Sequence, residues 1–270
     1  MQWGHWLAAV RQNRPLVHNI TNLVVTNTAA NALLSIGASP VMAYAHEEVA
    51  DMARIAAALA LNMGTLTPET VEAMRIAGGA ANSAGVPVVF DPVGVGATPY
   101  RTEMAQTLIR DVKLAVLRAN AGEMSVLLGL PGQVKGVDAL AADDALPMAM
   151  KAYAAEQGTV VIATGAVDFV TDGEHIWQLA NGHSLLSNIT GSGCMLTALL
   201  GAFVGVVPAG STPATYAEAC IAAVTSYNVA AEQAAKLAHG PGTFQAHLLD
   251  SLYTLEPSTV DERARVTSGV

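Results

Sequence analysis

A run of small residues stands directly before an apolar stretch, and this junction carries the clearest chemistry in the sequence. Residues 190–194 read Thr-Gly-Ser-Gly-Cys, and the apolar stretch 195–207 follows. Gly191 and Gly193 allow a tight turn, and the first turn of a helix has amide N–H groups without acceptors inside the helix. With Ser192 between the glycines, these amides predict a cradle for an anion such as a phosphate.

Cys194 falls at the start of the helix that this stretch predicts. Free amides and the helix dipole favour a thiolate at that position, so Cys194 is a candidate reactive group beside the anion. A glycine-rich entry to a buried helix, with Cys194 as a small apolar residue, would give the same pattern. The rest of the chain has to decide between these alternatives.

Two carboxylates lie where predicted strands end. Asp91 follows the strand expected at 86–90, and Glu123 comes shortly after the strand expected at 114–118. Ligands of open α/β sheets bind beyond the carboxyl ends of the strands, and Mg²⁺ prefers oxygen ligands that it shares with nucleotide phosphates. Asp91 and Glu123 therefore predict a magnesium site, although either alone could cap a turn or a helix.

Arg118 and Thr164 also stand at strand ends. Arg118 closes an apolar run, where an unpaired charge is costly, so it is expected to bind a phosphate or to pair with Asp91 or Glu123. Thr164, followed by Gly165, offers a hydroxyl to a nucleotide or simply leads the strand into a turn.

The elements that position these residues alternate along the chain. Strands are expected at 16–20, 40–43, 58–62, 86–90, 114–118 and 159–163. Helices are expected at 67–83, 99–111, 143–157, 195–207 and 215–236, and a final helix is expected to end at about 252. This order predicts a mostly parallel sheet covered by helices. Alternating runs around Asp172 and Gly173 add a β-hairpin within 166–179.

Composition bounds the class of protein. We expect one domain over 1–257 and a loose polar tail over 258–270, because no Gly, Ser or Pro-rich linker divides the 270 residues. Charged residues are only 13% and mean hydropathy is +0.39, which favours an oligomer. The apolar run 195–207 is too short to span a bilayer, and the N-terminus resembles no export signal, so we expect no membrane partner and a cytoplasmic location.

The charge and the cysteines exclude further classes. A net charge of -9 without a Lys/Arg cluster argues against a nucleic-acid partner. Two cysteines are too few for a disulfide framework, and they lack the spacing of zinc ligands.

Six segments, taken together and in this order, resemble the ribokinase-like superfamily and most closely its hydroxyethylthiazole kinases. They are VHNITNLVVTN at 17–27, GASPVM at 37–42, DPVGVG at 91–96, RANAGE at 118–123, TG at 164–165 and GSGC at 191–194. The resemblance implies an α/β fold, a ribokinase-like three-layer α/β/α sandwich with a mostly parallel central sheet. It also implies a homotrimer with sites between subunits, and a kinase that uses ATP and Mg²⁺ to phosphorylate 4-methyl-5-(2-hydroxyethyl)thiazole, a salvage step of thiamine biosynthesis.

The resemblance further implies roles for single residues. They are Asn22, Gly37, Met42 and Gly191 for the thiazole, Arg118 and Thr164 for ATP, and Asp91 and Glu123 for Mg²⁺ directly or through water. Most ribokinase-like enzymes resemble each other in carrying Asp where Cys194 stands. A free thiol has a pKa of about 8.5 and a nearby phosphate opposes its ionisation, so we expect a modest catalytic role for Cys194.

Three alternatives remain open from the sequence. A related kinase for another small alcohol, such as a hydroxymethylpyrimidine, would share the turn at 191–194. A nucleotide-binding protein without activity would keep the same loops. A dinucleotide-binding dehydrogenase fits poorly, because Gly94-Val95-Gly96 lacks the third glycine of that motif.

Overall fold

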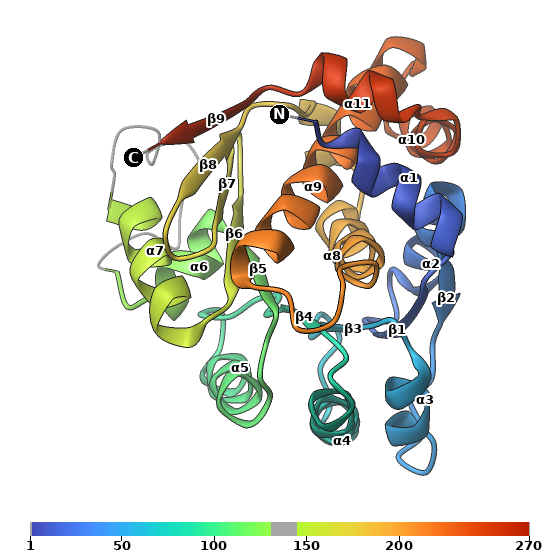
Figure 1. Ribbon diagram of the computed structural model, residues 1–270. Helices are drawn as coiled ribbons and strands as arrows, with labels where there is room; N and C mark the ends of the chain where they lie inside the picture. Colours follow the sequence, from blue (N-terminus) through green and yellow to red (C-terminus); the bar gives the residue numbers. More distant parts are fainter. Residues whose placement is uncertain (1, 131–144, 270) are drawn as a thin grey trace.

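The computed structural model describes residues 2–130 and 145–269, and a twisted sheet forms its centre (Figure 1). The strands are β1 (Leu16–Ile20), β2 (Ser39–Val41), β3 (Ala58–Asn62), β4 (Val88–Asp91), β5 (Val116–Asn120), β6 (Val160–Thr164), β7 (Asp168–Thr171), β8 (Ile176–Leu179) and β9 (Val266–Gly269). Their order across the sheet is β2-β1-β3-β4-β5-β6-β7-β8-β9. Pairing is parallel from β2 to β6 and antiparallel from β6 to β9. The carboxyl ends of the parallel strands therefore share one edge.

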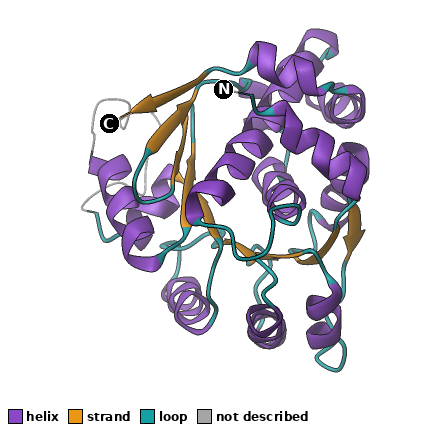
Figure 2. Ribbon diagram, in the orientation of Figure 1, coloured by secondary structure: helices purple, strands orange, loops and turns teal. Residues whose placement is uncertain are grey.

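Helices cover both faces of the sheet and give three layers (Figure 2). They are α1 (Gly4–Asn13), α2 (Thr26–Ile36), α3 (Val49–Ile55), α4 (Pro68–Ala84), α5 (Pro99–Asp111), α6 (Ala121–Leu127), α7 (Ala145–Gln157), η1 (Ser184–Asn188, a 3-10 helix), α8 (Ser192–Val204), α9 (Pro213–Leu237), α10 (Pro241–Thr254) and α11 (Pro257–Arg263). One core lies between the sheet and α1, α2, α8, α9 and α10, and a second lies under α3 to α7.

The apolar pattern of the strands explains this arrangement. Successive strand residues point to opposite faces, so Val89 enters the first core and Val88 enters the second. Strands covered on both faces need nearly continuous apolar sequence, as β3 and β4 have. The helix predicted from 195–207 is present as α8 and is buried from Met195 to Val204. Within 2–130 and 145–269, the helices lack the combination of length and apolar character that crossing a membrane requires.

Most of the predicted elements are confirmed, with shifted ends. The mostly parallel sheet, the hairpin of β7 and β8, and the helix at Pro99–Asp111 are all present. The helix α8 begins at Ser192, three residues before the predicted start. The helix predicted at 143–157 is α7 from Ala145 onward, and positions 143 and 144 lie outside the described residues.

The loose tail predicted after Pro257 is wrong for the residues described there. The segment forms α11 and then β9, which pairs antiparallel with β8. The Asp261 carboxylate accepts hydrogen bonds from the backbone N–H groups of Trp3 and Gly4, at 2.8 Å for Gly4, and so caps the start of α1. Figure 1 shows the N-terminus close to α11 and β9. Pairing with distant residues, which local sequence does not reveal, orders this segment.

Candidate active site

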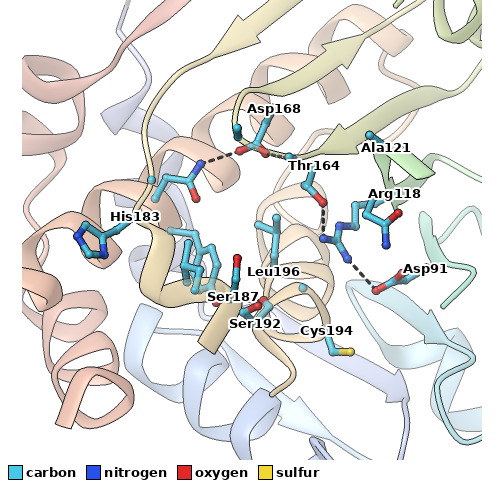
Figure 3. Close-up of a pocket in the computed structure, with 18 of the residues that line it drawn as sticks. Asp91, Arg118, Ala121, Thr164, Asp168, His183, Ser187, Ser192, Cys194 and Leu196 are labelled. Atoms are coloured by element: carbon cyan, nitrogen blue, oxygen red, sulfur yellow. Dashed lines mark hydrogen bonds and ion pairs between the residues drawn. The ribbon is translucent and has the colours of Figure 1, made fainter. Parts of the chain in front are cut away.

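A cavity of about 980 Å³ opens beyond the carboxyl ends of β4, β5 and β6, beside the start of α8 (Figure 3). Its lining includes Asp91, Arg118, Glu123, Thr164, Asp168, Asn181, His183, Ser187, Gly191, Ser192, Gly193, Cys194, Leu196, Tyr227 and Asn228. Parallel register places strand ends side by side there, because Asn62 pairs with Asp91 and Asn120 pairs with Thr164. The cavity therefore lies where ligands of open α/β sheets bind.

The turn before α8 has the geometry of an anion cradle. Gly191 is the N-cap residue with φ of 79°, a left-handed conformation that favours glycine, and a Cβ there would overlap the side chain of Val25. A Cβ on Gly193 would lie 2.6 Å from Nη1 of Arg118. Small residues are thus favoured at both positions. Gly191, Ser192 and Gly193 line the cavity, and the first turn of α8 has amides without acceptors inside the helix.

Asp91 is the centre of the buried polar network. Its Oδ2 atom accepts hydrogen bonds from Asn62 Nδ2 at 2.8 Å and from Thr197 Oγ1 at 2.7 Å, and it pairs with Arg118 at 3.2 Å. Its Oδ1 atom is buried and has no hydrogen-bond partner among the described residues. A buried carboxylate oxygen without a partner is costly, so Oδ1 is a ready ligand for a cation.

Arg118 links two strand ends. Its Nη1 pairs with Asp91, and its Nη2 donates to Thr164 Oγ1 at 2.6 Å (Figure 3). The side chain is only 9% exposed. Of the partners expected from the sequence, Asp91 is therefore the one that balances this charge, and Arg118 reaches the cavity from within the network.

Glu123 is held by backbone amides of two segments. Its Oε1 accepts from Gly94 N–H at 2.7 Å, and its Oε2 accepts from Asn120 N–H at 3.1 Å as part of the capping box of α6. Burial raises the pKa of Glu123, the hydrogen bond from Gly94 lowers it, and the negative charge of Asp91 raises it again. A cation beside both carboxylates would relieve that repulsion.

The donor set fits Mg²⁺ in part. Asp91 and Glu123 offer carboxylate oxygens, whereas the described residues contain no group of three or more His, Cys, Asp or Glu placed around one metal position. Mg²⁺ sites of nucleotide-binding proteins are commonly built from one or two carboxylates with waters and phosphates. The free Oδ1 atom of Asp91 agrees with such a site.

Cys194 lies at the base of the cradle, as predicted, but its environment favours the thiol. Burial raises the pKa of Cys194, the charge of Asp91 raises it further, and hydrogen bonds with Asn22 and Asn62 lower it in part. Asn22 Nδ2 lies 3.3 Å from Sγ. The expectation that the helix start would favour a thiolate is therefore wrong, because burial of the thiol and the charge of Asp91 together favour the neutral form.

The residues predicted for the thiazole do not all meet at this cavity. Asn22 contacts Cys194, and Gly191 lines the cavity. Gly37 ends α2 with φ of 104° and packs beside Arg11, while Met42 follows β2 and packs against the first core. Within the described part of one chain, Gly37 and Met42 are not among the lining residues.

Sequence reasoning missed several residues of the network. Asn62 ends the buried strand β3, so the rule that found Asp91 would also have found it. Thr197 is a hydroxyl inside the apolar run of α8, one turn after Gly193, to whose carbonyl oxygen it also donates at 3.2 Å. Asn228 lies on α9, and only the folded structure brings it to Asp168.

Asp168 joins the end of β6 to helix α9. Its Oδ1 accepts from Gly165 N–H at 2.9 Å, and its Oδ2 accepts from Asn228 Nδ2 at 2.7 Å (Figure 3). Burial raises the pKa of Asp168 to about 6, against these hydrogen bonds and the positive charge of Arg118. The turn after Thr164 is thus fixed by a carboxylate that titrates unusually high.

Comparisons with known proteins show the family to which this chain is similar. A sequence profile described as the Hydroxyethylthiazole kinase family matches residues 7–258. A protein of Moorella thermoacetica named hydroxyethylthiazole kinase is 52% identical over 259 residues, which cover 94% of this chain and 95% of that protein. A solved hydroxyethylthiazole kinase structure from Pyrococcus horikoshii is 41% identical, with a TM-score of 0.89 over 99% of each chain. A ribokinase-like superfamily protein of Enterococcus faecalis shares the fold, with a TM-score of 0.65, 12% identity and coverage of 92% and 89% of the two chains.

Proposed function

The chain belongs to the hydroxyethylthiazole kinase family, and from that premise we propose that it transfers the γ-phosphoryl group of ATP to the hydroxyl of 4-methyl-5-(2-hydroxyethyl)thiazole. The observation that carries the proposal is the network centred on Asp91, which joins the predicted metal side to Thr197 of α8, the helix that follows the turn at Gly191. The product would be the thiazole phosphate, and the step would salvage thiazole for thiamine synthesis.

The first-turn amides of α8 provide the electrostatic part of the reaction. Gly191, Ser192 and Gly193 would hold the transferred phosphoryl group, because N–H dipoles at a helix start favour negative charge. Thr164 and Arg118, on the neighbouring strands β6 and β5, would contact the nucleotide phosphates. Phosphoryl transfer depends mainly on positioning and charge neutralisation, which such a cradle supplies.

Asp91 and Glu123 would hold Mg²⁺, directly or through water. A bound Mg²⁺ neutralises phosphate charge during transfer. Hydrogen bonds from Asn62 and Thr197 orient the Asp91 carboxylate. Two backbone amides orient the Glu123 carboxylate, so both groups are in place before a ligand binds.

The alcohol would enter from the side of Asn22 and Cys194, with its hydroxyl near Gly191. The carboxamide of Asn22 is fixed, because its Nδ2 donates to Asn62 Oδ1 at 2.8 Å and its Oδ1 accepts from Val24 N–H at 3.1 Å. Cys194 would orient the hydroxyl as a neutral thiol.

The thiazole site would be completed between subunits of a homotrimer. Leu23, Val24 and Leu34 expose 80%, 62% and 58% of their surface, next to Asn22 and along α2 towards Gly37. Large apolar residues that are strongly exposed are common at interfaces, and Gly37 and Met42 lie away from the cavity of their own chain. Light scattering tests this proposal, and an active monomer of 27.7 kDa at assay concentration would refute it.

We also place the enzyme in the cytoplasm, where ATP is available. Cys194 and Cys220 are both free, as in proteins of reducing compartments.

An ATP-consumption assay across two alcohols tests the activity. The thiazole alcohol should stimulate ATP consumption in the presence of Mg²⁺, and a hydroxymethylpyrimidine should not. An Asp91→Asn variant should bind ATP but lose turnover, which excludes a contaminating ATPase. Turnover with the pyrimidine alone would favour the related kinase, and nucleotide binding without turnover would favour the silent binder.

A further inference from the structure

Arg101, on the first turns of α5, reaches across two loops that leave neighbouring strands. Its Nη1 donates to the carbonyl oxygens of Met63 at 2.7 Å and Val93 at 2.8 Å, and its Nη2 donates to that of Gly64 at 2.6 Å. Met63 and Gly64 follow β3, and Val93 follows β4. One planar guanidinium thus fixes both loops through charge-assisted hydrogen bonds.

The loop after β3 supports the predicted alcohol side. Gly64 N–H donates to Asn62 Oδ1 at 3.1 Å, and a Cβ on Gly64 would lie only 2.6 Å from Asn22 Nδ2. The backbone that Arg101 holds therefore packs directly on the Asn22 carboxamide, whose Nδ2 donates to Cys194 Sγ. A shift of Gly64 would move Asn22 and release the thiol.

The loop after β4 supports the predicted metal side. The peptide unit between Val93 and Gly94 is planar, so its two polar groups move together. Arg101 binds its carbonyl oxygen, and Glu123 Oε1 accepts its N–H at 2.7 Å. Gly94 has φ of 78°, and a Cβ there would lie 3.1 Å from Cδ of Arg101, so this peptide is packed against the arginine stem.

We propose that Arg101 is a positioning residue that couples the alcohol side, at Asn22 and Cys194, to the metal side, at Glu123. This inference rests on the proposed function for naming one side after the alcohol and the other after the metal. The coupling between the two sides follows from the contacts of Arg101 alone. Arg101 is not itself one of the cavity residues described. Its effect on the reaction passes through the backbone of Gly64 and Gly94.

The test compares Arg101→Lys with Arg110→Lys, the same change at another position of the same helix. Lysine keeps the charge but cannot span three carbonyl oxygens with a planar fork. Arg110 is 69% exposed and pairs with its neighbour Asp111, so its replacement should change neither side. Arg101→Gln provides a second variant, and thermal unfolding verifies that each protein is folded.

Two measurements that need no turnover report the two sides. The rate at which a thiol reagent labels Cys194 reports on Asn22, and the Mg²⁺ concentration needed for ADP binding, measured by calorimetry, reports on Glu123. We expect Arg101→Lys to change the labelling rate of Cys194 and to raise the Mg²⁺ concentration needed for ADP binding, each by at least about tenfold, a change equivalent to about 1.4 kcal/mol at each side. Cys220 is fully buried and gives the unlabelled background.

The outcomes separate the inference from the function. Folded Arg101 variants with both readouts unchanged, or with only one of them changed, would overturn the coupling. If the Arg101 variants shift both readouts but the wild-type protein fails to phosphorylate the thiazole, the coupling stands and the proposed function is refuted.

Discussion

Replacing Cys194 by alanine should lower kcat only modestly, because the structure places the thiol where it cannot act as a strong base. Burial and then the charge of Asp91 raise the pKa of Cys194 above the usual value of a thiol, and the bonds with Asn22 and Asn62 offset this in part. At pH 7 at most about three thiols in a hundred are then ionised.

The expected size of the effect follows from that fraction. General-base catalysis contributes about 10²- to 10⁴-fold when the base is correctly ionised. A thiol ionised to at most about three parts in a hundred retains no more than a few hundredfold of this, and a loose phosphoryl transfer gains little from a base. Cys194→Ala should therefore lose about tenfold or less in kcat, with ATP affinity nearly unchanged because the amides of the cradle remain.

Two further replacements separate chemistry from packing. Cys194→Ser keeps an acceptor for Asn22 Nδ2 but is not ionised, so it should behave like alanine or better. Cys194→Asp supplies a group ionised at pH 7 and should keep at least the wild-type kcat, provided that repulsion from Asp91 and the phosphate does not displace it.

The assay is kcat from pH 6 to 9 for all four proteins, with ATP affinity measured by calorimetry. A wild-type kcat that climbs tenfold per pH unit towards pH 9, together with a loss of more than about 10³-fold in Cys194→Ala, would refute the argument and identify a thiolate base. An alanine variant with full kcat at every pH would reduce Cys194 to a packing residue.

Other replacements test the remaining parts of the site. Thr164→Ala should weaken ATP binding more than thiazole binding, by about 1 to 3 kcal/mol in calorimetry, and equal losses for both ligands would contradict its placement. Arg118→Ala should also weaken ATP binding and should in addition lower stability by about 3 to 5 kcal/mol in urea unfolding, because Asp91 loses its buried partner; unchanged stability would show that the pair is not needed. Burial raises the pKa of Asp168 from 3.8 to about 6, so the stability from this group is full below pH 3.8 and is lost as the pH rises to about 6. Asp168→Asn should remove this pH dependence, which is on the order of 3 kcal/mol between pH 4 and 7. If the free energy of unfolding changes with pH in the same way in the wild type and the variant, this role of Asp168 is refuted. Gly191→Ala should abolish turnover while the protein stays folded, because a side chain there is strained and overlaps Val25, and normal kcat would exclude the cradle.

The sequence predicted the residues that parallel topology brings together. Asp91 and Thr164 end or follow short apolar strands, and in a parallel sheet all such ends meet at one edge. Residue type and position along the chain were therefore enough to place them.

The sequence did not predict what depends on burial or on distant partners. Thr197 looked like one hydroxyl in an apolar helix until α8 packed against Asp91. The thiol of Cys194 looked activated because sequence shows the helix start but not the loss of water. Strand β9 has a weak local pattern and forms because β8, far away in the chain, offers an open edge.

The hydrogen bonds from Trp3 and Gly4 to Asp261 can form only when the chain has been synthesised almost to its end. Helix α1 is made first and carries Trp6, Leu7 and Val10 into the core, yet the carboxylate that caps it belongs to Asp261, which is 257 residues beyond Gly4. A nascent chain on the ribosome must therefore hold α1 uncapped, with apolar surface at risk of wrong contacts, until translation is almost complete. Premature termination shortly before Asp261 would leave the kinase site fully encoded but would remove the carboxylate that caps the first helix.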